Sequence, residues 1–289
     1  MTDTAVLQKR TFGVLRWVAI VVFVLITVVP FYYMVLLSFV PISELLQNPG
    51  RLWVNPADLQ FGAYREVLSP VSEGGQGFLQ LMANSAMVAV ATTILTLLVS
   101  ILGAYAIARL RFPGRDKMVT LFLAVYLFPA VVLAGPLYIA FSYLGLTVSL
   151  VGVTIVYIAL TVPVSVQMLR DHFETIPISI EEAATIDGCN RYKMLRHVTL
   201  PLSTPAIMST GLYIFMIAWN EFLFALLFLT ADRDKWTVSL GLSQLTSGIE
   251  VPKTILMAGS VLLTVPIVLL YGIAERTLTE GLTSGADKG

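Results

Sequence analysis

The chain has 289 residues, of which 57% are hydrophobic and only 12% charged, and its mean hydropathy is +0.83. Soluble domains have about a quarter of their residues charged, so this composition excludes an ordinary soluble protein and indicates a polytopic membrane protein. The formal net charge is zero, so no excess of basic residues suggests a nucleic-acid partner.

Six stretches reach the length of about 20 mostly apolar residues that a spanning helix needs. We therefore predict an all-α polytopic membrane protein with six transmembrane helices, at 17–39, 82–108, 118–141, 150–169, 206–230 and 255–274. The first stretch follows basic residues, as a signal peptide would, but it is far longer than the 7–15 apolar residues of a signal-peptide core. We expect it to be retained.

Basic residues alternate between the connecting segments. The N-terminus 1–16, the loop after the second span, the loop 170–205 and the tail 275–289 carry most of the 18 Lys and Arg residues. Because positive loops stay in the cytoplasm, both termini and the loop 170–205 are expected there. Segment 40–81, which is net acidic and rich in Pro, Gly and Asn, is then external, where we expect a cap or a short interfacial helix.

Prolines interrupt four of the predicted spans. A proline removes a backbone donor and frees a carbonyl, which lipid tolerates only where neighbouring helices or water satisfy it. Such kinks suit a pore or a transporter, although proline is also common in membrane helices in general. The residues are Pro30, Pro129, Pro163 and Pro266.

The fifth span contains the polar sequence Trp219, Asn220 and Glu221. A carboxylate at membrane depth is costly unless it faces protein or water, so it is by default a functional-site hypothesis. The alternative is that Glu221 pairs with a partner and fixes helix packing. Asn84 and Ser85, at the start of the second span, are the next candidates of this kind.

No catalytic constellation is visible in the sequence. Glu181 and Glu182 are adjacent, so on a helix they point about 100° apart and cannot act together on one bond. The single cysteine, Cys189, and two histidines make no metal-ligand pattern. A phosphate-binding P-loop needs Gly-Lys, and this dipeptide does not occur. We expect no enzyme activity and no cofactor in this chain, and ATP-driven work would need an ATPase on another chain.

The loop 170–205 is predicted to contain two short helices joined by a turn. In "IPISIEEAATIDG", Ser179 is expected to cap a helix with Glu182 at its third position, and Gly188 to end it. A second short helix, "NRYKMLRHV", carries basic residues such as Arg191, and "LPLSTP" breaks it before the fifth span. The prediction is an acidic limb, a turn and a basic limb, which suits docking to a partner.

The same loop closely resembles the EAA signature of membrane subunits of binding-protein-dependent ABC importers, E-A-A-x3-G-x9-I-x-L-P. The departures are Val198 for the usual Ile, Cys189 for Ala and Leu195 for Phe. Segment 84–115 resembles the second-span region of carbohydrate importer permeases. Segments 219–230, 256–271 and 281–289 are similar to the type found in the maltose/trehalose/glycerol-phosphate group. The residues that match the signature are Glu182, Ala183, Ala184, Gly188, Leu200 and Pro201, and Val198 stands at the position of the Ile.

The resemblance implies a type I ABC importer permease fold and a role in sugar import. Partners would be a second permease subunit in a heterodimer, two ATPase subunits that carry ATP and Mg, and an extracytoplasmic sugar-binding protein. The location would be a bacterial or archaeal plasma (inner) membrane, and the tail 281–289 would reach the ATPase dimer. The residues expected to couple to the ATPase are Glu181, Glu182, Ala183, Ala184, Asp187, Gly188 and Arg191.

The sugar pathway is expected to use Asn84, Trp219, Asn220 and Glu221, because sugars need hydrogen-bonding amides or carboxylates and an aromatic face. A second hypothesis is an ion-coupled secondary carrier in which Glu221 is the coupling carboxylate. Such a carrier would have no use for an EAA loop, so the loop argues against it. A membrane enzyme is a third class, and the lack of a catalytic constellation argues against that.

Overall fold

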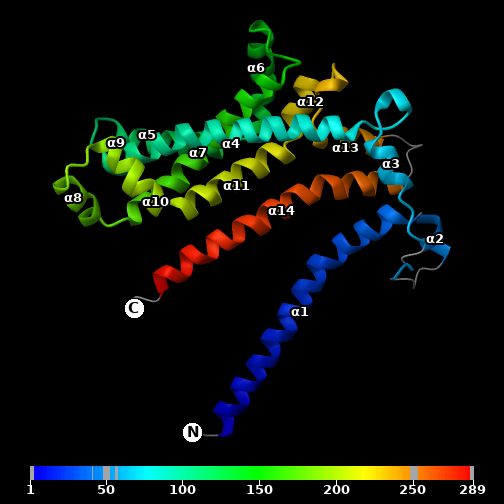
Figure 1. Cartoon of the computed structure of the whole chain (residues 1–289), viewed down its shortest axis with the longest axis horizontal. Helices are drawn as coiled ribbons and strands as arrows, with labels where there is room; N and C mark the ends of the chain where they lie inside the picture. Colours follow the sequence, from blue (N-terminus) through cyan, green and yellow to red (C-terminus); the bar gives the residue numbers. More distant parts are fainter. Residues whose placement is uncertain (1–2, 41, 48–52, 56–57, 248–252, 287–289) are drawn as a thin grey trace. The chain divides into compact units, whose positions relative to one another are not determined.

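The computed structural model describes residues 3–40, 42–47, 53–55, 58–247 and 253–286 (Figure 1). Every regular element in these ranges is helical. The chain divides into two compact units, one made of 1–77 with 245–262 and the other of 78–244 with 263–289.

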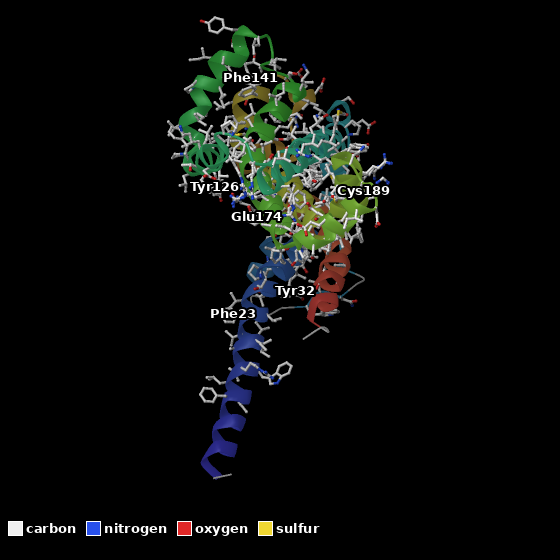
Figure 2. All side chains as sticks on the ribbon, turned by 90° about the vertical axis from the view of Figure 1, so that its left-hand side faces the viewer. Phe23, Tyr32, Tyr126, Phe141, Glu174 and Cys189 are labelled. Atoms are coloured by element: carbon white, nitrogen blue, oxygen red, sulfur yellow. The ribbon has the colours of Figure 1, made fainter. Side chains whose placement is uncertain are left out.

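The first unit contains the long helix α1 (Asp3–Phe39) and the short helices α2 (Ile42–Gln47), α3 (Gly62–Leu68) and η2 (Val71–Glu73). Most of the apolar side chains of α1 from Phe12 to Val35 are exposed. Phe23, which is 70% exposed, projects from the helix in Figure 2. Such a surface is suited to lipid.

Helix α3 packs against the end of α1. The Ser38 and Tyr64 hydroxyls lie 2.8 Å apart, and the rings of Phe39 and Tyr64 are 5.0 Å apart. Burial raises the pKa of the Tyr64 hydroxyl, and the hydrogen bond to Ser38 opposes this shift. The contact holds α3 on the end of α1.

The second unit is organised around α4 (Phe78–Arg109), α7 (Leu150–Thr175) and α11 (Thr204–Asn220). Around this group lie shorter helices and the long last helix, whose first ten residues belong to the other unit. They are α5 (Arg115–Leu127), α6 (Ala130–Tyr143), α8 (Ile178–Ile186), α9 (Arg191–Met194), η3 (Leu195–Thr199), α10 (Leu200–Leu202), α12 (Leu223–Leu229), η4 (Arg233–Lys235), α13 (Val238–Ser247) and α14 (Lys253–Ala286).

Small and hydroxyl-bearing side chains form the seam between α4 and α7. The Thr96 and Thr161 hydroxyls are buried and lie 3.0 Å apart, while Ser165 donates to the Thr161 carbonyl at 2.8 Å. In lipid, small residues let helices approach closely and hydroxyls bond across the gap, each bond contributing about 0.6 kcal/mol. On α4, buried small or hydroxyl-bearing residues recur every three or four positions, at Ala89, Thr92, Thr96, Ser100 and Ala104.

Four helices of the described chain are long and apolar enough to cross a membrane, or up to six if each bent helix pair is one span. The predicted third span, 118–141, is one such pair, because α5 and α6 meet at 96°. Pro129 directly precedes α6 and Phe128 is extended. The predicted interruption at Pro129 is a break between two helices, since the proline ends α5 instead of kinking it.

The predicted fifth span, 206–230, is also interrupted. Helix α11 ends at Asn220, Glu221 has extended backbone angles (φ −63°, ψ 131°), and α12 begins at Leu223. The expectation that Glu221 lies inside a continuous helix is therefore wrong. Its carboxylate lies at a helix break, which changes what it can do.

The glycine at position 152 of α7 gives a test of this packing. A Cβ added to Gly152 would clash with the Leu146 carbonyl oxygen. We expect Gly152→Ala to destabilise the fold by about 1–3 kcal/mol, as overpacked sites do, and to lower the melting temperature of the detergent-solubilised protein.

The matched control is Gly135→Ala on α6, where nothing lies within 4 Å of the added Cβ. Alanine favours a helix over glycine by up to about 1 kcal/mol, so this variant should melt at or above the wild-type temperature. Equal melting temperatures for the two variants would contradict the tight approach of Leu146 to α7.

Candidate functional site

The segment from Ile178 to Leu202, here called the α8–α9 element, lies at one end of the helix group formed by α4, α7 and α11 (Figure 1). Helix α8 follows Pro177, which takes the N-cap position without a side-chain hydrogen bond. The predicted cap, Ser179, lies inside the helix, so that expectation is wrong. A proline fixes the backbone at the helix start and does not need a capping side chain.

The turn after α8 is a Schellman motif. Gly188 has φ +83°, its N–H donates to the Thr185 carbonyl, and the Cys189 N–H donates to the Ala184 carbonyl, both at 3.0 Å. Asn190 then caps α9 by accepting from the Lys193 N–H at 2.9 Å. The predicted helix, glycine turn and second helix are confirmed, except that Asn190 is the cap of α9 and not its first helical residue.

The α8–α9 element exposes an unusual mixture of side chains. Ile186 is 87% exposed, Tyr192 67% and Ile178 64%. Apolar groups exposed among charges are typical of an interaction surface. All seven predicted coupling residues lie on this element. Besides Glu181 they are Glu182, Ala183, Ala184, Asp187, Gly188 and Arg191, which are exposed or half-buried.

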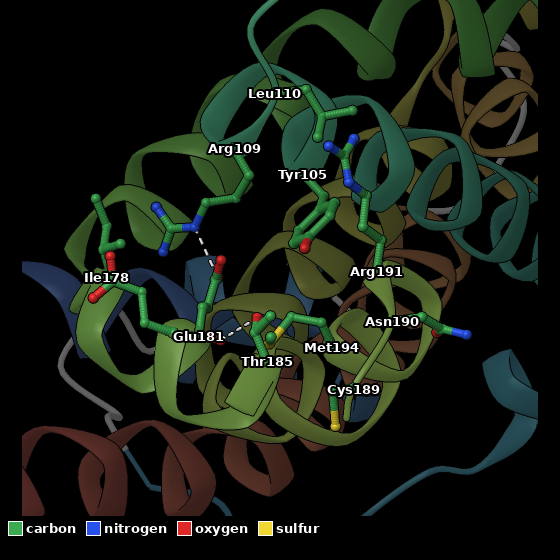
Figure 3. Close-up of a pocket in the computed structure, with 11 residues that line it drawn as sticks. Tyr105, Arg109, Leu110, Ile178, Glu181, Thr185, Cys189, Asn190, Arg191 and Met194 are labelled. Carbon is green, nitrogen blue, oxygen red and sulfur yellow. Dashed lines mark hydrogen bonds and ion pairs between the residues drawn. The ribbon is translucent and has the colours of Figure 1, made fainter. Parts of the chain in front are cut away.

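The seventh, Glu181, makes an ion pair within the chain. Its Oε1 accepts from Arg109 Nε at 2.8 Å, and the two side chains are only 14% and 10% exposed (Figure 3). Arg109 Nη2 also donates to the Phe173 and Ile176 carbonyls, at 2.7 and 2.9 Å. No sequence signal pointed to a role for Arg109 beyond its charge, because its partners are 64 to 72 residues away.

A cavity of about 470 Å³ lies between the end of α4 and the α8–α9 element (Figure 3). Tyr105, Arg109, Glu181, Cys189 and Arg191 are among the residues that line it. It is large enough to accept a side chain of another protein. Across the described part of the chain, no three His, Cys, Asp or Glu side chains are grouped so that they could hold a metal ion.

Glu221 connects three elements of the second unit. Its carboxylate accepts from the Tyr157 hydroxyl of α7 at 2.5 Å and from the first backbone N–H groups of α12, Phe224 at 3.0 Å and Ala225 at 3.2 Å. Its carbonyl accepts from the Ser239 hydroxyl at 2.6 Å. Glu221 therefore caps α12, and the helix dipole favours a carboxylate there. The sequence did not reveal Tyr157 as its partner.

Asn84 makes a similar connection at the start of α4. Its Nδ2 donates to the Asp234 carbonyl at 2.7 Å and to the Trp236 carbonyl at 2.9 Å. The adjacent Ser85 hydroxyl accepts from the Val238 N–H at 2.8 Å. Both residues thus hold the loop between α12 and α13 on α4.

The other two predicted pathway residues lie differently. Trp219 is buried, its Nε1 donates to the Leu263 carbonyl of α14 at 3.0 Å, and its ring stacks on Phe215. Asn220 is exposed, and its Nδ2 donates to the Met216 carbonyl of its own helix at 2.9 Å. The structure therefore does not gather the four residues into one cluster.

Residues 98–280, which include the whole α8–α9 element, match the family of binding-protein-dependent transport system inner membrane components. The chain belongs to this family. It is 34% identical over 284 residues to the inner membrane ABC transporter permease protein YcjP of Escherichia coli (strain K12), covering 98% of this chain and 99% of that protein. The EAA signature is thus the family's own motif, and this permease is a multi-pass protein of the inner membrane.

Two further comparisons agree with this family. This permease is 35% identical over 278 residues to the trehalose/maltose transport system permease protein MalG of Thermococcus litoralis, covering 96% and 97% of the two chains. It also matches a chain of a bacterial ABC transporter involved in the import of the acidic polysaccharide alginate, with a TM-score of 0.78, 25% identity and 93% and 97% coverage. The protein is a permease subunit of an ABC importer.

A double-mutant cycle tests the contact between Tyr157 and Glu221. We expect Tyr157→Phe and Glu221→Gln each to lower the free energy of unfolding. The double variant should lose less free energy of unfolding than the two single variants lose together. The difference, which is the interaction energy, should lie within the range of about 0.5–3 kcal/mol seen for contacting residues. Thermal unfolding in detergent measures each step.

The control is Asn220→Ala at the neighbouring exposed position, where we expect a change within about 0.5 kcal/mol. Strict additivity of the two single variants would contradict the hydrogen bond between the Tyr157 hydroxyl and the Glu221 carboxylate.

Proposed function

We propose that this permease forms half of the translocation pathway of an ATP-driven sugar importer and couples to a separate ATPase subunit through the α8–α9 element. The observation that carries the proposal is the exposed face of this element, on which apolar and charged side chains lie around the residues of the EAA signature. The sugar class is supported by the trehalose/maltose and alginate systems to which the chain is similar.

The working complex in this proposal has a second permease subunit, two ATPase subunits with ATP and Mg, and an extracytoplasmic sugar-binding protein. The chain crosses a bacterial or archaeal plasma membrane six times, at the six predicted spans, with both termini and the α8–α9 element in the cytoplasm. The distribution of Lys and Arg supports this orientation. The tail 281–289 adds a contact to the ATPase dimer; its residues 287–289 lie outside the described range.

The α8–α9 element has the chemistry for docking in a groove. Ala183 is small and exposed, so a partner surface can approach α8 closely, and Gly188 provides the tight turn. Glu182 and Asp187 are exposed and can form charge-assisted hydrogen bonds with arginines of the ATPase. When ATP closes the ATPase pair, the docked elements of the two permease subunits are drawn together. The cavity between the permease subunits then changes the side of the membrane to which it opens.

Asn220 is the residue that we assign to the sugar pathway. Its amide is exposed at the end of α11, with its Oδ1 available to a hydroxyl. Asn84, Trp219 and Glu221 use their polar atoms within the chain, so in this proposal they hold the shape of the pathway. The contacts of Glu221 also argue against an ion-coupled carrier, because a coupling carboxylate must exchange its ligand during the cycle.

Reconstitution tests the energy source. In proteoliposomes with all partner subunits, we expect sugar uptake to require ATP on the side of the membrane where the ATPase subunits lie. We expect a protonophore to leave the uptake rate unchanged. Uptake that continues after the ATPase subunits are removed would overturn the importer proposal and favour the carrier.

Glu182→Lys tests the docking face. Because the change reverses an exposed charge on the element, we expect the ATPase subunits to be lost from the affinity-purified permease while the amount inserted in the membrane stays the same. Glu73→Lys, a charge reversal at an exposed position on η2, is the matched control and should retain them. Full retention of the ATPase by Glu182→Lys would show that the docking face lies elsewhere.

A further inference from the structure

One guanidinium joins three helices at the base of the α8–α9 element. Arg109 is the last residue of α4, and its donors reach the carbonyls of Phe173 and Ile176 at the end of α7 and the carboxylate of Glu181 in the first turn of α8. No other side chain in the described ranges is shown bridging these three elements.

Arg109 complements the charge and hydrogen bonding at the end of α7 and at the start of α8. The Phe173 carbonyl accepts one backbone bond, from the Ile176 N–H at 3.1 Å, and the Ile176 carbonyl lies just past the end of α7. A cation beside these C-terminal carbonyls is favoured by the helix dipole. Glu181 stands in the first turn of α8, where the dipole favours an acid. Arg109 satisfies both ends because its planar fork presents donors in different directions, whereas a lysine ammonium is a point charge.

Two extended residues connect α7 and α8, Ile176 and Pro177, with ψ of 122° and 131°. The proline ring fixes φ of Pro177. The link can still act as a hinge through both backbone angles of Ile176 and ψ of Pro177, since hinges are a few terminal residues that absorb changes in φ and ψ. The ion pair between Arg109 and Glu181, largely shielded from solvent, is the side-chain connection across this hinge.

The basic limb of the element follows a different route. Residues from Arg191 to Leu202 lead into α11 across a bend of 79°, while α8 is connected to α4 and α7 by Arg109. The acidic limb is thus attached to α4 and α7, and the basic limb to α11. A partner that moves the element therefore acts on all three helices.

We propose that Arg109 is a positioning residue that transmits movement of α8 to α4 and α7, with Glu181 as its partner. This inference rests on the proposed function and divides the roles of two adjacent glutamates. Glu182 faces the ATPase and holds it, whereas Glu181 faces inward and passes the movement on. Loss of Glu182 releases the partner; loss of Glu181 leaves the partner bound but disconnected.

The test uses the full complex in proteoliposomes and measures sugar molecules taken up per ATP hydrolysed. Glu181→Gln keeps the side-chain shape and removes the charge. We expect ATPase subunits to stay bound and hydrolysis to continue, while uptake per ATP falls about 5- to 150-fold, the usual range of coupling between sites. Arg109→Gln should lower the uptake per ATP in the same way as Glu181→Gln. The uptake per ATP of Arg109→Lys should lie between that of Arg109→Gln and that of the wild type.

A charge exchange separates the ion pair from the bonds to α7. In the double variant Arg109→Glu with Glu181→Arg, the ion pair can form again, but the Phe173 and Ile176 carbonyls lose their donor. We expect this variant to recover part of the uptake per ATP that Arg109→Glu alone loses. Arg111→Gln, two residues further on and exposed, is the matched control and should keep the wild-type ratio.

The outcomes are distinct. Absence of ATP-driven uptake in the wild-type complex would refute the proposed function itself. If the wild type transports and Glu181→Gln keeps its full ratio of uptake to hydrolysis, the positioning role is wrong. If Glu181→Gln instead loses the ATPase subunits, Glu181 is a docking residue and the division of roles is overturned. Should Arg109→Gln fail to fold, the uptake ratio of Glu181→Gln still decides between these outcomes.

Discussion

Backbone polar groups have no partner in hydrocarbon, and the polar side chains of this permease are placed mainly to satisfy them where helices end. Lipid offers no hydrogen bonds, so each interrupted helix must find donors and acceptors within the protein. Glu221 supplies acceptors to the first turn of α12, and Arg109 supplies donors to the last turn of α7. Trp219 differs from these two, because it donates to a carbonyl inside a helix, that of Leu263 in α14.

Helix α4 carries two of these polar connections, near its opposite ends. Asn84 holds the α12–α13 loop and Arg109 holds α7 and α8, and the 25 residues between them correspond to about 37 Å of helix. Along this length the small-residue seam with α7 keeps the two helices in close contact. Packing thus makes a firm pair of helices, and the polar groups attach the irregular segments to it.

The helix–turn–helix of the α8–α9 element could be predicted from the sequence, because its signals are local: charge, glycine and the EAA spacing all lie within some 25 residues. Prediction failed where a residue's role depends on distant contacts. Adjacent Glu181 and Glu182 look alike in sequence, and only Arg109, 72 residues earlier, distinguishes them. Proline was equally ambiguous, since Pro30, Pro163 and Pro266 remain inside helices while Pro129 precedes a new one.

Cys189 has a practical value that follows from its place. It is the sole cysteine of the sequence, it is a half-buried thiol directly after Gly188, and it lines the cavity beside Arg109 and Glu181. A thiol-reactive fluorophore therefore labels the unaltered chain at one position, between the acidic and the basic limb. Its emission reports the local environment of the turn in real time, without any cysteine having to be removed or introduced.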